Sequence, residues 1–189
     1  RLLSRKTDQV ARHIDNSDGR AHLQDENFSA LAHRACLQDH LRCFGNRHEE
    51  AVDLRMRDGH GPALLDLAQV VHLSGQLDWA EIQAAAVKLP EHLVSRYHIF
   101  PYLHEEMGAA LASADLVVSR AGASALGEFP AFGLPAVLVP YPYAWRYQKV
   151  NAEYLAQRGA AVVVEDHRLA EQLLPAVSTL LTNQEKLSE

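Results

Sequence analysis

Short apolar runs alternate with longer segments of mixed polarity along residues 61–189 of the chain. Runs of four to six mainly apolar residues predict strands at 69–74, 96–100, 115–119, 136–139 and 160–164. The stretches that follow these runs predict helices at 79–89, 105–113, 124–132, 148–157 and 169–181. Asp78 is the expected cap of the first of these helices, and Pro175 predicts a kink in the last.

Strands that alternate with helices of about ten residues are typical of βαβ units. We therefore predict an α/β fold, a Rossmann-like parallel sheet with helices on both faces. The predicted strands are almost wholly apolar, which fits a sheet that is covered on both sides. In such folds ligands bind at the carboxyl ends of the strands, so we expect functional residues in the loops that follow the strands.

Residues 1–60 differ in composition from the rest of the chain. They contain ten Lys or Arg and ten Asp or Glu residues, and only 10 Val, Ile or Leu residues against 35 in residues 61–189. A segment of this kind buries too little apolar area to offset the entropy lost when its chain is ordered. We therefore expect a divergent, poorly packed or disordered extension over 1–60, which translation out of frame would explain, and a folded domain over 61–189.

The formal net charge of −6 argues against a general nucleic-acid binder, because phosphate contacts need a cationic surface. No run of about 18 apolar residues occurs, so we predict no transmembrane helix. The two cysteines, Cys36 and Cys43, are too few for a disulfide scaffold, and a cytosolic compartment is the default expectation. With His40 and His48 they could bind zinc, but the spacing fits no established pattern. We assign no metal site and no cofactor.

The loop after the third predicted strand is rich in small residues. Residues 119–124 (Ser-Arg-Ala-Gly-Ala-Ser) join this strand to a helix that carries Glu128 one turn from its start. Small residues let the backbone approach a ligand closely, and N–H groups at the start of a helix attract an anion. A carboxylate at position 128 can accept hydrogen bonds from two hydroxyl groups, as from a ribose. An ordinary β–α turn with a solvated glutamate fits the same spacing.

Two further loops hold candidate ligand-binding groups. Residues 140–151 follow the fourth predicted strand, contain four aromatic residues and end in the amide pair Gln148 and Asn151. These amides are three residues apart, so they share one helical face and suit the hydroxyl or acetamido groups of a sugar. A surface loop with an aromatic interface patch is the alternative. Residues 100–107 follow the second predicted strand, where backbone groups either contact a base edge or form an ordinary loop and helix cap.

In combination, these loops resemble the C-terminal donor-nucleotide domain of MurG-type glycosyltransferases of family 28. The matching motifs are Ser119-Arg120-Ala121-Gly122-Ala123 through Glu128, Gly133-Leu134-Pro135-Ala136, Gln148 with Asn151-Ala152, and Gly159-Ala160-Ala161. Their combined order is specific, although each motif alone is not. The resemblance is strongest over residues 114–164 and extends more weakly from about residue 64 to the end of the chain.

The resemblance implies the C-terminal half of a GT-B fold and a binding site for UDP-N-acetylglucosamine (UDP-GlcNAc). Carried over by position, the backbone near Leu103 would contact uracil, and Glu128 would bind the ribose hydroxyls. Gln148 would hold the sugar hydroxyls, with Asn151 supporting it. The turn that holds the diphosphate and ribose would comprise Gly122, Ala123, Ser124, Ala125, Leu126, Gly127 and Glu128.

The resemblance further implies an inverting, metal-independent hexosyltransferase of peptidoglycan synthesis. Its partners would be UDP-GlcNAc and a lipid-linked acceptor, lipid I, which it converts to lipid II as a peripheral protein at the cytoplasmic face of the membrane. The family's N-terminal acceptor domain, which supplies the general base, has no counterpart in the sequence. We therefore expect a donor-binding fragment that is inactive alone, and we assign no catalytic residue. Residues 57–62 stand where the family has a Gly-Gly-Ser-x-Gly-Ala loop that contacts the donor phosphates.

Two other functions remain open. One is the donor-binding subunit of a two-chain lipid-linked N-acetylglucosaminyltransferase, which a partner gene encoding the other half would favour. The other is a non-catalytic UDP-sugar binding module, which would bind UDP-GlcNAc without turnover even when acceptor and partner are supplied.

Overall fold

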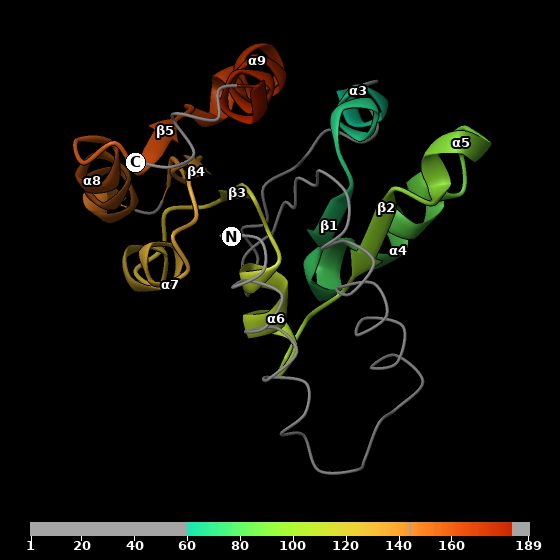
Figure 1. Cartoon of the computed structure of the whole chain (residues 1–189), viewed down its shortest axis with the longest axis horizontal. Coiled ribbons are helices and arrows are strands. Elements are labelled where there is room, and N and C mark those ends of the chain that lie inside the picture. The colour runs from blue at the N-terminus through green and yellow to red at the C-terminus, as the bar shows by residue number, and fades with distance from the viewer. Residues whose placement is uncertain (1–59, 144, 183–189) are drawn as a thin grey trace, which may run out of the picture.

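The computed structural model describes residues 60–143 and 145–182, with only the backbone at 60, 145 and 146. Helices and strands alternate along this part of the chain (Figure 1). The strands are β1 (Val70–Leu73), β2 (Tyr97–Phe100), β3 (Val117–Ser119), β4 (Ala136–Leu138) and β5 (Ala161–Val163). The helices are α3 (His60–Leu67), α4 (Gly75–Ala86), α5 (Glu91–Val94), α6 (Met107–Ala112), α7 (Ala125–Ala131), α8 (Trp145–Ala156) and α9 (Leu169–Thr182), with the 3₁₀ turn η1 (Asp166–Arg168) before α9.

Several expectations fall on residues that the structure does not describe. These are the poorly packed extension, which overlaps the described residues only at His60, and the zinc candidates Cys36, His40, Cys43 and His48. Over 60–143 and 145–182, no helix combines the length and the apolar character that a membrane crossing requires.

The five predicted strands are all present, each one or two residues shorter than predicted. The prediction that Asp78 caps a helix is wrong, because α4 begins at Gly75 with Ser74 at its N-cap position. Asp78 lies within the first turn, where a carboxylate favourably faces the positive end of the helix dipole. Among the other helix starts, that of α8 differs most from the prediction. This helix begins three residues before Gln148, and no proline or glycine lies between Pro142 and that residue.

Two helices are additional to the predicted ones. In α3, Pro62 lies in the first turn, where the missing N–H of proline would have no helical partner in any case. The short helix α5 has Pro90 at its N-cap position.

Every strand pairing in the described chain is parallel. β1 pairs with β2, and β3, β4 and β5 form a second ladder in that order. Val117 lies opposite Ala136, which in turn lies opposite Ala161. The prediction of a Rossmann-like parallel α/β fold is therefore confirmed, with its hydrogen bonding divided into two ladders.

Helices cover both faces of these ladders. Successive residues of a strand point to opposite faces. Val118 accordingly belongs to a buried cluster with residues of α3, α4, α5 and α9, and Val117 to one with residues of α6, α7 and α8. In Figure 1, α3 and α9 lie on one side of the strands, and α6 and α7 on the other. Each of the two buried clusters contains residues of both ladders, so the ladders share both cores.

Helices α7 and α8 each end in a short turn that leads into the next strand, β4 and β5 respectively. Gly133 and Gly159 follow these helices with φ angles of +62° and +74°, in the left-handed region that glycine adopts without strain. At each end, the N–H of the residue after the glycine donates to a carbonyl five residues earlier, at 2.9 and 3.1 Å. This Schellman-type closure ends both helices.

Candidate functional site

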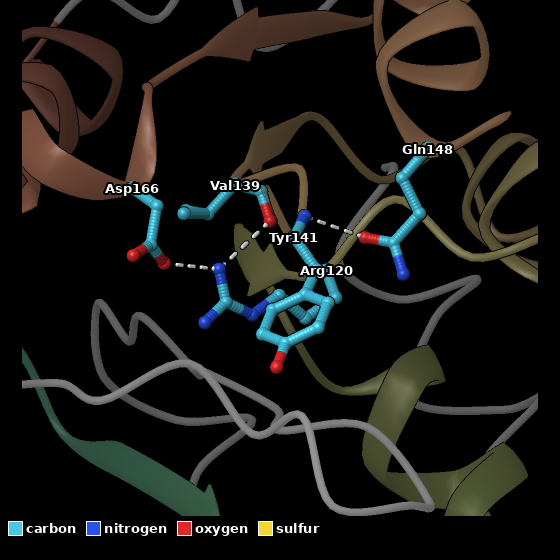
Figure 2. A network of polar contacts seen from close by, with 5 residues as sticks. All are labelled: Arg120, Val139, Tyr141, Gln148 and Asp166. Atoms are coloured by element: carbon cyan, nitrogen blue, oxygen red, sulfur yellow. Dashed lines mark hydrogen bonds and ion pairs between the residues drawn. The ribbon is translucent and has the colours of Figure 1, made fainter. Parts of the chain in front are cut away.

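The loops that follow β3, β4 and β5 lie together at the carboxyl ends of these strands (Figure 2). In parallel α/β sheets this edge is where ligands bind. Two of the three loops that the sequence singled out, 119–124 and 140–151, are found here.

The turn between β3 and α7 presents backbone groups to solvent. Ala121 is fully buried, whereas Ala123 and Ser124 are exposed. The Ala125 N–H donates to the Gly122 carbonyl at 3.1 Å. The N–H groups of Ala123 and Ser124, in contrast, donate to no backbone carbonyl of the described residues. These two N–H groups are therefore available to an anion.

The first turn of α7 has open space beside it. A Cβ built on Gly127 would meet no atom within 4 Å. Glu128 is exposed, and its own N–H is anchored to the Ser124 carbonyl at 2.8 Å. The Glu128 carboxylate thus stands on a fixed backbone and can accept hydrogen bonds from a ligand.

Two amides of α8 hold the loops on either side of this turn. The Oε1 atom of Gln148 accepts the N–H of Tyr141 at 2.8 Å, and Gln148 is only 9% exposed. Figure 2 shows its amide nitrogen directed away from Tyr141. The Nδ2 group of Asn151 donates to the Ala121 carbonyl at 3.0 Å. Asn151 thus supports the turn after β3, and Gln148 is fixed to the loop after β4.

Leu103, the predicted uracil contact, lies on the loop after β2. As a whole residue it is 4% exposed, and it belongs to the same buried cluster as Ala121 and Ala125. Neither its N–H nor its carbonyl bonds to another of the described residues. Leu103 therefore packs in the core as a whole, and its N–H and carbonyl are the only groups through which it could hydrogen-bond to uracil.

A buried arginine at this edge received no role from the sequence. Arg120 is 6% exposed, and its Nη1 atom donates to the Val139 carbonyl at 3.3 Å and to Asp166 Oδ1 at 2.5 Å. Its guanidinium also lies 5.3 Å from the centroid of the Tyr141 ring. The available signal was a cationic residue directly after an apolar strand, which needs a carboxylate partner when buried.

Other features lie away from this edge or are absent from it. Over the described ranges, no cluster of three or more His, Cys, Asp or Glu side chains could hold a metal ion. A cavity of about 220 Å³ is lined by Pro135, Ala136, 159–162 and Leu180, at the start of β4 and β5. This cavity therefore opens at the opposite end of the strands from the candidate site.

Comparison with known families gives one match that covers most of the chain. The model of the glycosyltransferase family 28 C-terminal domain matches residues 45–189. The match begins inside the segment 1–60, which composition alone separates from the rest.

Curated relatives include two transferases of the same name. The UDP-N-acetylglucosamine--N-acetylmuramyl-(pentapeptide) pyrophosphoryl-undecaprenol N-acetylglucosamine transferase of Roseiflexus sp. (strain RS-1) is 50% identical over 125 residues, which cover 58% of this chain and 28% of the relative. Its counterpart in Chlorobaculum parvum is 32% identical, over 99% of this chain and 55% of the relative.

Among solved structures, the crystal structure of Acinetobacter baumannii MurG is similar to this fold. Its TM-score is 0.64 at 30% identity, over 80% of this chain and 43% of that chain. The expected likeness to GT-B glycosyltransferases is confirmed. The chain spans between about a quarter and about a half of the length of these three proteins.

Proposed function

The chain belongs to glycosyltransferase family 28, whose C-terminal domain it carries, and we propose that it binds UDP-GlcNAc as the donor part of a MurG-type transferase. The proposed reaction transfers GlcNAc to N-acetylmuramyl-(pentapeptide) pyrophosphoryl-undecaprenol, the acceptor in the relatives' names, during peptidoglycan synthesis. The main support is that Gln148 and Asn151 of α8 hydrogen-bond to the loops after β4 and β3. The loop after β3 leads into α7, which carries the exposed Glu128.

Each part of the donor has a proposed contact at this edge. The ribose hydroxyls donate to Glu128, and the uracil hydrogen-bonds to the backbone of Leu103. The diphosphate accepts from the N–H groups of Ala123 and Ser124. Because α7 has only seven residues, we assign the diphosphate to these N–H groups and not to a helix dipole. Gln148 binds the sugar.

The proposed chemistry is an inverting displacement without a metal. The acceptor hydroxyl attacks the anomeric carbon from the face opposite UDP, its proton passes to a base, and the bond from that carbon to the diphosphate oxygen breaks. Negative charge then grows on the leaving diphosphate, where preorganised N–H donors stabilise it most. We place the base and the acceptor contacts in the part of the enzyme that lies outside the described residues.

The proposed acceptor also sets the proposed location. A polyprenyl-linked substrate stays in the bilayer, so the enzyme must work at the membrane surface. We therefore propose a peripheral position at the cytoplasmic face, where UDP-GlcNAc is present.

Calorimetric titration of the full chain with UDP-GlcNAc tests the donor site. Glu128→Gln removes the carboxylate charge but keeps the shape of the side chain. We expect it to lower the affinity about tenfold or more, the range for a hydrogen bond to a charged group. Glu171→Gln is the matched control, since Glu171 is likewise exposed in the first turn of a helix, α9.

Two results would count against the proposal. A folded wild-type chain that shows no heat of binding with UDP-GlcNAc would overturn the donor site as a whole. Equal affinities of the Glu128→Gln and Glu171→Gln variants would overturn the assignment of the ribose to Glu128.

A further inference from the structure

Arg120 is the feature of this edge that the proposed donor contacts leave unexplained. Its side chain is 7% exposed and sits in a loop otherwise made of small residues. A guanidinium stays charged at every pH at which proteins are folded. Burying that charge is unfavourable unless it is both paired and hydrogen-bonded, so its partners show what the residue holds in place.

The partners of Arg120 come from neighbouring strand ends. Arg120 itself follows β3, the Val139 carbonyl follows β4, and Asp166 begins η1 after β5. One guanidinium therefore ties together the carboxyl ends of the three strands of this ladder, as Figure 2 shows.

Tyr141 connects this ion pair to Gln148. The Tyr141 ring lies within cation–π range of the Arg120 guanidinium, at 5.3 Å from its centroid. The backbone N–H of the same residue donates to Gln148 Oε1 at 2.8 Å. The position of the ring and the position of the N–H are thus coupled through one residue.

We propose that Arg120 and Asp166 are positioning residues, which hold Tyr141 so that its N–H orients the Gln148 amide toward the sugar of the donor. The coupling from Asp166 to Gln148 is a property of this chain, and only the identity of the sugar rests on the proposed function. Asp166 is more than 40 residues from Arg120 in sequence, and its side chain bonds to Arg120, which is not one of the proposed donor contacts. Its substitution should therefore affect recognition of the sugar and spare recognition of the nucleotide.

Amide hydrogen exchange at Tyr141, followed by NMR on the full chain, tests the coupling without any ligand. Asp166→Asn keeps the shape but loses the charge that holds Arg120. We expect the Tyr141 amide to exchange about fivefold faster or more in this variant, and likewise in Gln148→Ala. Glu165→Gln is the matched control, because Glu165 is the adjacent carboxylate and faces His167 at 3.5 Å. Asp166→Glu restores the charge and should restore slow exchange.

The exchange experiment has outcomes that overturn the proposal. Unchanged Tyr141 exchange in Asp166→Asn, with faster exchange in Gln148→Ala, would show that the ion pair does not hold Tyr141. Unchanged exchange in Gln148→Ala would show that the Gln148 side chain does not hold it either. If exchange in Asp166→Asn rises as much at amides throughout the core as at Tyr141, the variant has lost stability in general, and the ion pair does not position Tyr141.

Titration of the same variants with UDP-GlcNAc and with UDP separates sugar from nucleotide. Asp166→Asn should weaken UDP-GlcNAc binding about fivefold and leave UDP binding within about twofold. In a Gln148→Ala background it should have no further effect, because the two substitutions remove the same contact. Equal losses for both ligands would overturn the positioning role. A wild-type chain that binds neither ligand would overturn the proposed function, while the exchange experiment would still decide the coupling.

Discussion

Asn151 joins α8 to the loop after β3 through one hydrogen bond, to the carbonyl of the fully buried Ala121. Asn151→Ala leaves that carbonyl without its donor, and a buried acceptor without a partner costs about 1–3 kcal/mol. We expect the free energy of unfolding to fall by about this amount, less the few tenths that alanine gains in a helix. Urea unfolding followed by circular dichroism measures the difference.

Gln157→Ala is the control for Asn151→Ala. Gln157 is an exposed amide just beyond the end of the same helix, so its loss should change the free energy of unfolding by about 0.5 kcal/mol or less. Equal stabilities of the two variants would show that the bond from Asn151 to Ala121 contributes nothing.

At the residue scale, some contacts of the site could be predicted from the sequence and others could not. The spacing of Gln148 and Asn151 placed two amides on one helix, because helical periodicity is a local property. The pairing of Arg120 with Asp166 could not be predicted from the sequence, because it joins two strand ends that only the tertiary fold brings together. The donor contacts assigned to Leu103 and Glu128 remain predictions.

Two glycines, one within α7 and one just after it, should change the free energy of unfolding in opposite directions when each is replaced by alanine. Gly133 follows the helix at a φ of +62°, where a side chain costs about 1–2 kcal/mol. Gly127 lies inside the helix, and a Cβ there meets no atom within 4 Å. We expect Gly133→Ala to lower the free energy of unfolding by about 1–2 kcal/mol, and Gly127→Ala to raise it by about 0.5–1 kcal/mol. Urea unfolding of both variants checks the signs, and two losses of similar size would contradict the assignment.

At the element scale, strands were easier to predict than helix starts. Each apolar run fixed a strand within two residues, because a buried strand needs apolar side chains on both faces. Glycine fixed the ends of α7 and α8, since it alone adopts a positive φ freely. The predicted starts of α4 and α8 lie later in the chain than the observed ones. For α4 the reason is that Asp78 is as favourable within a first turn as at a cap.

At the scale of the whole molecule, the alternation of strands and helices predicted the parallel fold but not its division into two ladders. Strand order and pairing depend on contacts between distant segments, which periodicity does not encode. Both buried clusters nevertheless contain residues of both ladders. We therefore expect the described part of the chain to unfold as one cooperative unit.

A substitution in one ladder should accordingly destabilise the other. In a Trp145→Phe background, Trp79 on α4 is the single tryptophan and reports on the part of the molecule next to β1 and β2. Leu138 of β4 is fully buried in one cluster with Val71 of β1, so Leu138→Ala should cost about 2–5 kcal/mol. The urea midpoint from Trp79 fluorescence should fall as far as the midpoint from circular dichroism. Leu77→Ala, the same change at a 76% exposed site close to the probe, should move neither midpoint. A Trp79 midpoint that Leu138→Ala leaves unchanged would mean that the β1–β2 ladder unfolds on its own.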